Sequence, residues 1–379
     1  EAATPHQVII WRPDVGPRQK PIDIMAEFAV ALFPPRQIGP PSFVNTALDK
    51  TARLLRRFQQ GPIARPDNLS EHQCADILVD RYMPPGPVLG TVVFIHGMSV
   101  LGREDPRVRQ LAVALTTTGL QVLVPELPSI RDLRIERAQP SEVQSTLEQL
   151  TGNKDLVPTR HFALMAVSFS GVFALRAANS ATLGPRISAL CLIGGYYDVE
   201  RVSDFLVNAN RAVPYGRMLM VRSYYSEVEV ENEAFHRHLE RCIRNNAKED
   251  EGWNLRSLLD KTDTEQERLW QLLSDSGQRQ RFLQKVIRAF GDDWSGYRVN
   301  LNFVNPKTPV FLLHGRGDRV IPPGESRRLS SQMSVQGIPN YLCITRFLSH
   351  GDSVIRLSQL PELYRLLRGF AWFISCTRR

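Results

Sequence analysis

The sequence predicts an α/β protein with a mostly parallel central sheet, helices on both faces and a long helical insertion. Two observations support this prediction. Short apolar runs of strand length alternate along the chain with segments of helical periodicity. Between about residues 200 and 304 the alternation stops, and polar, amphipathic helical stretches follow one another. Strand–helix alternation places helices on both faces of a parallel sheet, so the insertion is expected between two strands of that sheet.

The apolar runs differ in a way that indicates their surroundings. The first alternates between apolar and acidic residues, which is typical of an edge or antiparallel strand, whereas the middle runs are apolar throughout, as in strands buried on both faces. The expected strands are Ala75–Tyr82, Thr91–Ile95, Gln121–Pro125, Phe162–Val167, Ala189–Ile193, Pro309–Leu313 and Tyr341–Phe347. The expected helices are Asp105–Thr118, Ser141–Leu150, Val172–Ala178, Glu325–Met333 and Ser353–Ile374, with Glu231–Asn245, Thr264–Ser274 and Gln278–Phe290 in the insertion.

The chain is expected to divide into three regions. The α/β core is assigned to residues 71–200 and 301–379, and the helical cap insertion to residues 201–300. Residues 1–70 are rich in Pro and Arg and are expected to form an N-terminal extension packed on the core. The segment 22–33 within it is an amphipathic helix candidate, for which packing against the core is the expected role and contact with a membrane surface the alternative.

Composition limits the classes of partner. The 379 residues are 42% hydrophobic and 23% charged, as in an ordinary globular chain with a large core. The net charge of +8 comes mainly from scattered arginines, so no nucleic-acid partner is expected. The five cysteines form no CxxC pair, which argues against a zinc site or a disulfide scaffold and favours a cytoplasmic location. Because the chain begins at Glu1, a removed signal or anchor stays an alternative.

The sequence Ala-Val-Ser-Phe-Ser-Gly predicts a nucleophile elbow, a sharp turn between a strand and a helix. A serine on such a turn projects at the carboxyl edge of the sheet, where α/β proteins bind ligands. The turn requires small residues two positions before and two positions after the nucleophile. Around Ser168 these residues are Ala166 and Ser170, with Gly171 next, whereas around Ser170 the later position is a β-branched valine. Ser168 is therefore the predicted nucleophile and Ser170 a spacer, and an ordinary polar turn is the alternative.

An earlier strand is followed by a loop suited to bind a negatively charged oxygen. Cleavage of an ester or amide develops such an oxyanion, which preorganised N–H groups stabilise. The backbone N–H of Phe169, directly after the nucleophile, is one candidate donor. The second is Met98 N–H, because Gly97 lets the loop after the strand approach the elbow. His96 is expected to support this loop and not to act as a base.

Two later loops contain an acid and a histidine. Asp318 follows a buried strand within His-Gly-Arg-Gly-Asp-Arg-Val-Ile-Pro-Pro, and an acid in this position can orient a histidine and stabilise its cation. His350 follows the next expected strand. The interval between Asp318 and His350 leaves room for one helix and one strand, so both loops are expected at the same edge of the sheet.

Together these motifs resemble those of the α/β-hydrolase superfamily, in its order of Ser, Asp and His. The matching pieces are His96-Gly97, Ala166-Val-Ser168-Phe-Ser170-Gly171, His314-Gly-x-x-Asp318-x-x-Ile-Pro-Pro and His350-Gly351. The resemblance covers about residues 75–200 and 301–379 and implies the α/β-hydrolase fold with a helical cap. A serine at the nucleophile position differs from the dehalogenase and epoxide-hydrolase branches, which use a carboxylate.

The resemblance also implies a role for each site residue. Ser168 attacks, His350 accepts its proton and Asp318 holds His350. The N–H groups of Met98 and Phe169 form the oxyanion hole. The acid has a rival in Asp198, which follows the preceding strand, where some members of the superfamily carry the acid.

The expected function is cleavage of a carboxylic ester, with a partly apolar small-molecule substrate, through an acyl-enzyme. Lactone, thioester or amide hydrolysis, acyl transfer and a non-catalytic binding protein on this fold are the alternatives. No metal or organic cofactor is expected, because this chemistry uses side chains and backbone dipoles. The loop Ser99–Arg107 is rich in charged residues. One interpretation is that one of these side chains contacts the substrate, and the other is that Asp105 caps a helix. Tyr196 and Tyr197 either line the crevice or pack in the core.

Overall fold

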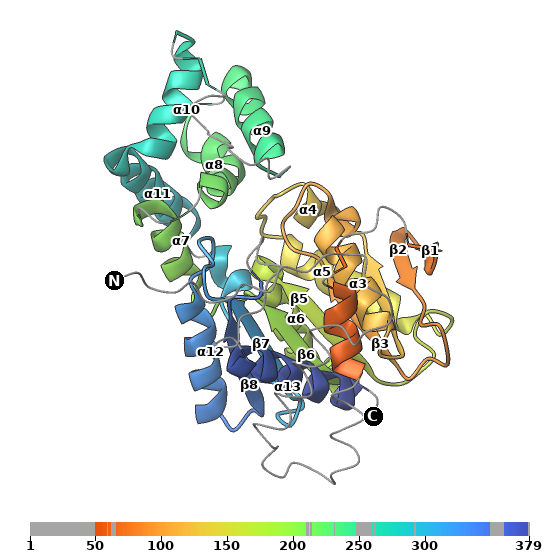
Figure 1. Ribbon diagram of the computed structural model, residues 1–379. Helices are drawn as coiled ribbons and strands as arrows, with labels where there is room; N and C mark the ends of the chain where they lie inside the picture. The colour runs from red at the N-terminus through yellow and green to blue at the C-terminus, as the bar shows by residue number, and fades with distance from the viewer. Residues whose placement is uncertain are drawn as a thin grey trace, which may run out of the picture.

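An eight-stranded mixed sheet forms the centre of the protein (Figure 1), in the order β1-β2-β4-β3-β5-β6-β7-β8. Strand β2 is antiparallel to both its neighbours, and the pairs from β4 to β8 are parallel. The strands are β1 (Leu69–Cys74), β2 (Ile77–Tyr82), β3 (Gly90–Ile95), β4 (Leu120–Pro125), β5 (Phe162–Val167), β6 (Ile187–Ile193), β7 (Val310–Gly315) and β8 (Asn340–Thr345).

The structure is a computed structural model and describes only part of the chain. The described residues are 50–58, 60–61, 66–209, 212, 214–230, 232–247, 259–260, 262–291, 293–348 and 360–377. The expected helix at 22–33, most of the N-terminal extension, His350 and the expected start of the last helix lie outside these residues. Within them, no helix combines the length and apolarity needed to cross a membrane.

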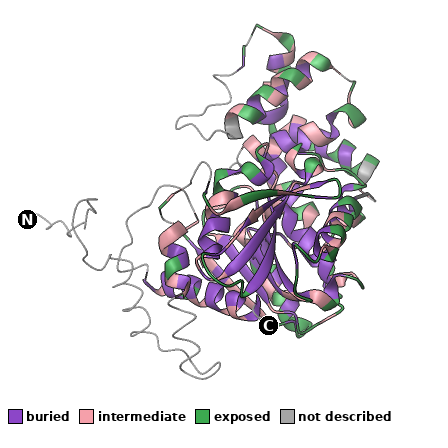
Figure 2. Ribbon diagram, turned by 90° about the vertical axis from the view of Figure 1, so that its right-hand side faces the viewer, coloured by how far each residue is buried: buried purple, intermediate pink, exposed green. Residues whose placement is uncertain are grey.

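Helices cover both faces of the sheet, and the side chains of β3 show the alternation between them. Val92 and Phe94 belong to a buried cluster that includes α3, α13 and the helix over residues 50–58, whereas Val93 and Ile95 belong to a second cluster that includes α5, α6 and α12. Figure 2 shows buried residues along the central strands and exposed ones on the outer sides of the helices. These helices are α3 (Pro106–Thr116), α5 (Gln139–Gly152), α6 (Gly171–Asn179), α12 (Pro323–Val335) and α13 (Leu360–Thr377).

The predicted fold class is confirmed, and six of the seven expected strands match β3 to β8 within a few residues. The segment 75–82, expected as one strand, is instead the turn and second strand of a hairpin. Ala75 has a φ of 50° in the turn, and β1 precedes it. The sequence does not signal β1, because its residues are mostly polar and lie half-buried or exposed at the edge of the sheet.

Among its described residues, five α-helices form the helical insertion, which lies between β6 and β7 in the sequence and above the sheet in Figure 1. They are α7 (Val199–Asn208), α8 (Pro214–Val228), α9 (Glu233–Ala247), α10 (Thr264–Ser274) and α11 (Ser276–Phe290). The last three match expected helices. The sequence analysis missed α7 and α8. The apolar residues of α8 lie on several sides of the helix and show no single stripe.

Two arginines hold the helical insertion together through backbone carbonyls. Arg217 of α8 donates from Nε to Leu206 O (2.7 Å) and from Nη2 to Ala209 O (2.8 Å). Arg279 of α11 donates from Nε to Val207 O (2.6 Å). The carbonyls at the end of α7 lack partners within their own helix, so these guanidinium groups satisfy their hydrogen-bonding capacity. Their positive charge also interacts favourably with the negative end of the helix dipole.

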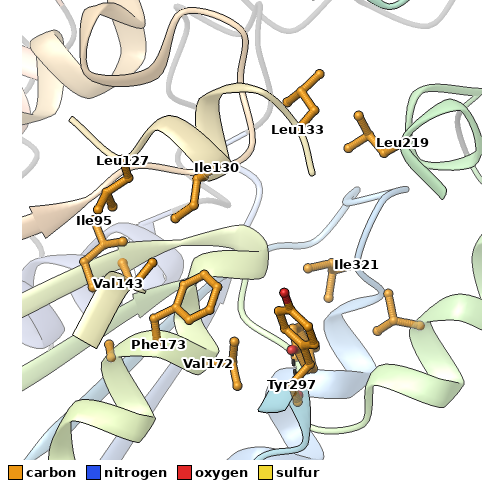
Figure 3. Close-up of a cluster of buried hydrophobic side chains, with 14 of the residues drawn as sticks. Ile95, Leu127, Ile130, Leu133, Val143, Val172, Phe173, Leu219, Tyr297 and Ile321 are labelled. Atoms are coloured by element: carbon orange, nitrogen blue, oxygen red, sulfur yellow. Dashed lines mark hydrogen bonds between the residues drawn. The ribbon is translucent and has the colours of Figure 1, made fainter. Parts of the chain in front are cut away.

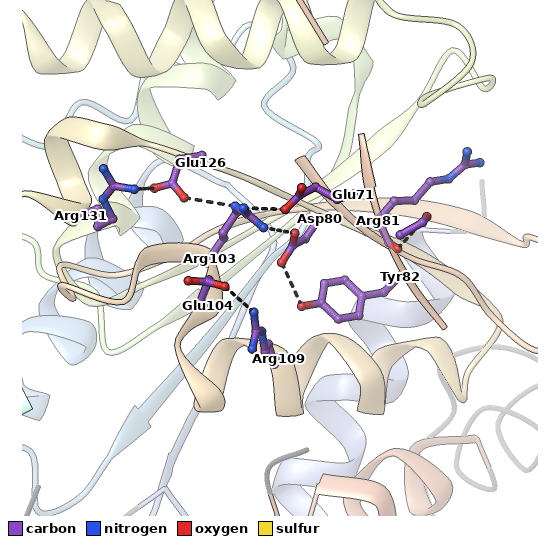
Figure 4. Close-up of polar contacts among 10 residues, drawn as sticks. Glu71, Asp80, Arg81, Tyr82, Arg103, Glu104, Arg109, Glu126 and Arg131 are labelled. Carbon is purple, nitrogen blue, oxygen red and sulfur yellow. Dashed lines mark hydrogen bonds and ion pairs between the residues drawn. The ribbon is translucent and has the colours of Figure 1, made fainter. Parts of the chain in front are cut away.

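A buried ion-pair network joins the β1–β2 hairpin to the loop after β3 (Figure 4). Arg103 pairs with Asp80 of β2, with Glu71 of β1 (2.7 Å) and with Glu126 after β4 (3.2 Å). The side chain of Asp80 is only 1% exposed. Burial raises the pKa of Asp80 above its usual 3.8, despite the opposing effect of Arg103. Arg103 therefore contacts three carboxylates from three parts of the chain, and Arg131 shares Glu126 with it at 3.5 Å.

Replacing Arg103 by methionine is expected to lower the free energy of unfolding by about 3–5 kcal/mol near neutral pH, because Asp80 loses its closest cation while it stays buried. A carboxyl whose folded-state pKa is raised stabilises the fold when protonated and loses that contribution as pH rises through this pKa. The deficit should therefore shrink at lower pH. Urea unfolding at about pH 8 and about pH 5 measures both effects.

The matched control is Arg134→Met. Arg134 makes an exposed ion pair with Glu136 at 3.2 Å, which contributes about 0–1 kcal/mol. A deficit for Arg103→Met that is the same at both pH values, or no larger than that of the control, would contradict the expectation.

Candidate active site

Ser168 stands on the turn directly after β5 and has a φ of 58°, the left-handed region that non-glycine residues rarely adopt. A short 3-10 turn over Ser168–Ser170 leads straight into α6. Such backbone strain persists only where the surrounding structure holds it, and it is the geometry of a nucleophile elbow. Ala166, two residues earlier, is completely buried at the end of β5.

The two serines of the motif have different surroundings. Ser168 is partly exposed and lines a cavity. Ser170 is fully buried, and its hydroxyl donates a hydrogen bond to the backbone carbonyl of His96 at 2.7 Å. Ser170 therefore ties the elbow to the loop after β3, a role beyond that of the expected spacer. An added Cβ at Gly171 would lie 3.5 Å from the Gly195 Cα, so the start of α6 runs close beside the end of β6.

The loop after β3 lies against the elbow. A Cβ added to Gly97 would lie 3.4 Å from Val167 O and 3.7 Å from Ser168 Cβ. His96 Nδ1 lies 3.0 Å from Gly97 O, and since a carbonyl only accepts, Nδ1 carries the proton. This bond holds the peptide unit whose N–H belongs to Met98, the expected oxyanion donor.

Burial lowers the pKa of His96 to about 4, so its ring is neutral near pH 7. The ring is fully buried, and Nε2 has no hydrogen-bond partner among the described residues. His96 is not among the residues that line the cavity beside Ser168. Its surroundings fit the expected support of the loop and do not suit a base that exchanges protons with a substrate.

A largely apolar cavity of about 90 Å³ opens beside Ser168. Met98 and Phe169, the two expected oxyanion donors, line it together with residues of the helical insertion. Ile321, Tyr297 and Leu219 belong to its wall and lie within the apolar cluster of Figure 3. The full lining is Met98, Ile135, Ser168, Phe169, Tyr196, Val199, Val202, Ser203, Leu206, Tyr215, Gly216, Leu219, Met220, Tyr224, Trp294, Tyr297, Val320 and Ile321.

Polar groups in the cavity wall are bound to the protein itself. The hydroxyl of Tyr196 donates to Tyr297 O (2.8 Å), and the hydroxyl of Tyr297 donates to Glu136 O (2.6 Å). Ser203 donates to Val199 O within α7 (2.8 Å). The space that remains beside Ser168 therefore suits an apolar group.

The carboxylate of Asp318 is held at the carboxyl edge of the sheet after β7. Its Oδ1 accepts from the N–H groups of Val320 (2.8 Å) and Ile321 (3.0 Å), and its Oδ2 lies 3.4 Å from His314 Nε2. The same oxygen would lie 3.5 Å from a Cβ added to Gly194, at the end of β6. Asp318 thus has one oxygen committed to its own loop and the other turned toward the neighbouring loop.

Asp198, the rival acid, caps α7. Its Oδ1 accepts from Glu200 N (3.0 Å) and Arg201 N (3.1 Å), the usual bonds of an N-cap. Its own N–H donates to the buried carboxylate of Glu325 at 3.0 Å. A helix-capping role therefore explains Asp198 without a catalytic one.

His350 lies outside the described residues, but the chain that leads to it is described as far as Leu348. A Cβ added to Gly315, at the end of β7, would lie 3.6 Å from Leu348 Cβ. Leu348, the last described residue before His350, therefore lies beside the start of the loop of Asp318. Whether His350 reaches Ser168 stays a prediction.

The loop after β3 uses its charges structurally. Asp105 is the N-cap of α3: its Oδ1 accepts from Arg107 N (2.9 Å), with a proline at the first helical position. Its Oδ2 accepts from the Ser99 hydroxyl at 2.8 Å. Neither Arg103 nor Glu104 belongs to the cavity wall, and Arg103 is committed to its ion-pair network. Tyr196 lines the cavity, whereas Tyr197 does not.

The sequence analysis missed the part of the wall that the helical insertion supplies. Val199, Val202 and Leu206 of α7 recur at helical spacing, and this amphipathic pattern could have revealed them. Tyr215 and Leu219 lie on α8, where no single apolar stripe distinguishes them.

Comparisons with known proteins find distant likeness only. No family model matches the sequence, and no curated protein matches it. The chain is similar to the acylaminoacyl peptidase of Pyrococcus horikoshii (13% identity, TM-score 0.41, 83% of this chain and 41% of that one). It is similar to a puromycin-hydrolyzing peptidase of Mycobacterium tuberculosis (15% identity, TM-score 0.46, 82% of this chain and 39% of that one). It is also similar to a bacterial brefeldin A esterase (13% identity, TM-score 0.45, 96% of this chain and 95% of that one). It spans less than half the length of the two peptidases.

The fold is identified from the geometry of the chain itself. The sheet runs antiparallel across β1 and β2 and parallel from β4 to β8, the left-handed turn at Ser168 follows β5, and Asp318 follows β7. The loops that carry these residues meet at the carboxyl edge of the parallel strands. The chain therefore has the α/β-hydrolase fold, as its resemblance to that superfamily predicts.

Proposed function

We propose that the protein is a serine hydrolase that cleaves carboxylic esters with a short, apolar acyl group. The observation that carries the proposal is the left-handed backbone of Ser168, at a strand–helix turn that faces an apolar cavity. The left-handed conformation strains the backbone of any residue other than glycine. A nucleophile elbow explains why the fold retains a serine there. Ser170, two residues later, is buried and hydrogen-bonded, so it is not available to attack.

In the proposed reaction the Ser168 Oγ attacks the carbonyl carbon of the ester while His350 accepts the hydroxyl proton. Asp318 orients His350 and stabilises its cation. The negative oxygen binds the N–H groups of Met98 and Phe169. The alcohol then leaves with the proton from His350, and water hydrolyses the acyl-enzyme by the same steps.

Two features support this oxyanion site. Phe169 lies at the amino end of α6, where the helix dipole favours negative charge. Its ring is fixed by Tyr297 (5.3 Å between centroids) and Tyr196 (5.8 Å). The Met98 N–H belongs to the peptide unit that His96 holds through Gly97 O. Donors held before the reaction stabilise the oxyanion without reorganisation.

The size of the cavity supports a short acyl group. Its volume is about 90 Å³, whereas a cavity of about 150 Å³ in another protein holds a benzene ring of six carbons. At the same cavity volume per carbon atom, this cavity has room for an acyl group of about four carbons. We therefore infer that the preferred acyl groups range from acetyl to butyryl.

A fluorophosphonate probe tests the nucleophile directly. The full-length protein is incubated with the probe, digested and mapped by mass spectrometry. Modification of Ser168 is the expected result, since attack on phosphorus needs the same activated hydroxyl. Modification of Ser170 instead, or of neither serine, would overturn the proposal.

A series of p-nitrophenyl esters then tests the acyl group. The value of kcat/KM is expected to be highest near four carbons and to fall for longer chains. An optimum at eight carbons or more would contradict the inferred acyl size while leaving the nucleophile assignment intact.

A further inference from the structure

We infer that Tyr215 of α8 is a positioning residue for the oxyanion hole, through which the helical insertion governs the catalytic competence of the core. The inference rests on the proposed function. It starts from one contact: the Tyr215 hydroxyl donates a hydrogen bond to the backbone carbonyl of Met98 at 2.9 Å. Tyr215 belongs to the helical insertion, and Met98 to the loop after β3.

This contact completes a series along the loop. Three consecutive carbonyls each accept a hydrogen bond from a side chain. His96 O accepts from the Ser170 hydroxyl (2.7 Å), Gly97 O from His96 Nδ1 (3.0 Å) and Met98 O from Tyr215 (2.9 Å). The first two donors belong to the core, whereas the third comes from the helical insertion. The peptide units on both sides of the Met98 Cα are thereby held.

The third bond matters because of where the expected oxyanion donor lies. Met98 N–H is in the peptide unit between Gly97 and Met98, and the Tyr215 bond holds the next unit. Without it, the Met98 carbonyl has no side-chain donor, and the next side-chain bond along the loop is the one from Ser99 to Asp105. The direction of the Met98 N–H is then less well defined. Oxyanion donors lose catalytic value steeply when misplaced, because they must lie about 2.7–3.1 Å from the developing charge.

Tyr215 also faces the space that a substrate would fill. Its side chain lines the cavity next to Ser168 and Met98. It lies one turn before Leu219, another wall residue on α8. Since α8 carries both the wall and the bond to Met98, docking of α8 on the core sets the shape of the cavity and the oxyanion loop together. A displaced α8 would leave Ser168 in place with a poorly formed oxyanion hole.

Tyr215→Phe removes the hydroxyl and keeps the ring. The rate of Ser168 modification by a fluorophosphonate is measured first, because it requires no knowledge of the natural substrate. In this step the Ser168 Oγ–P bond forms, the P–F bond breaks and fluoride leaves, while the serine proton passes to the base. Negative charge grows on the phosphoryl oxygen, so the step needs the oxyanion donors.

The modification rate is expected to fall about tenfold, the effect of one lost hydrogen bond. With p-nitrophenyl butyrate, kcat is expected to fall by a similar factor while KM changes little, because the oxyanion forms only in the transition state.

The matched control is Tyr225→Phe on the same helix. The buried hydroxyl of Tyr225 has no hydrogen-bond partner among the described residues, and its ring stacks on Phe235 at 4.0 Å between centroids. This variant loses the same atom from α8 without a bond to the core, so its modification rate and kcat are expected to stay at the wild-type values. Both variants are expected to keep the wild-type melting temperature within a few degrees.

Three outcomes would overturn the inference. If Tyr215→Phe is modified at the wild-type rate, the bond does not position the oxyanion loop. If Tyr225→Phe slows as much, the effect is a general loss in α8. If KM rises while kcat is unchanged, Tyr215 only lines the cavity. These results leave the proposed function standing as long as wild-type Ser168 is modified. Failure of the wild type to react overturns both.

Discussion

Replacing Ser168 by alanine is expected to lower kcat for p-nitrophenyl butyrate by about a millionfold, to the residual rate that binding and the oxyanion donors support. The reason is that no acyl-enzyme forms without the hydroxyl. Alanine fits the tight turn, and the variant should fold normally, although the left-handed φ of 58° stays strained. Steady-state kinetics and fluorophosphonate modification measure the loss.

Ser170→Ala is the companion variant, because it separates the attacking serine from the structural one. It removes the hydrogen bond to His96 O and is expected to reduce kcat about tenfold, the effect of one such bond. The assignment of the nucleophile would be wrong if Ser170→Ala lost all activity while Ser168→Ala kept a substantial part of it.

Replacing Asp318 by asparagine is expected to lower kcat by about 10⁴-fold. The amide oxygen can still accept from Val320 N and Ile321 N, so the loop should keep its shape. The amide nitrogen then replaces the oxygen that faces the neighbouring loop. A donor in that place neither stabilises a histidine cation nor selects the tautomer that accepts the serine proton.

Asp198→Asn is the test of the rival acid. Asparagine is as good an N-cap as aspartate, so the bonds to Glu200 N and Arg201 N should persist and the variant should fold. We expect little change in its kcat. If Asp198→Asn loses activity and Asp318→Asn does not, the acid is Asp198.

The sequence predicts the strands best where both faces of the sheet are buried. Strands β3 to β7 are mostly apolar because helices cover both faces, and their sequences show this directly. Strand β1 lies half in solvent at the sheet edge, so its residues show no apolar run. Helix α8 is buried on several sides, which removes the stripe that identifies a surface helix.

In the candidate site, the sequence distinguishes residues to which a steric rule applies. It does not distinguish residues whose roles depend on the direction of their side chains. The small residues around Ser168 distinguish it from Ser170, and the structure gives only Ser168 the left-handed backbone. Asp198 and Asp318 both follow strands, and only their hydrogen bonds reveal that one caps a helix. The bond from Tyr215 to Met98 links residues 117 positions apart, so no local pattern announces it.

The hydrogen bonds from arginine side chains to backbone carbonyls inside the helical insertion have an evolutionary consequence. Arg217 and Arg279 bind the carbonyls of Leu206, Val207 and Ala209, and every amino acid supplies a carbonyl. The side chain of Leu206 meanwhile lines the cavity. Substitutions at Leu206 therefore change the wall of the cavity without removing a hydrogen-bond acceptor from α7. The proposed function then predicts that new acyl specificities arise by single mutations in α7.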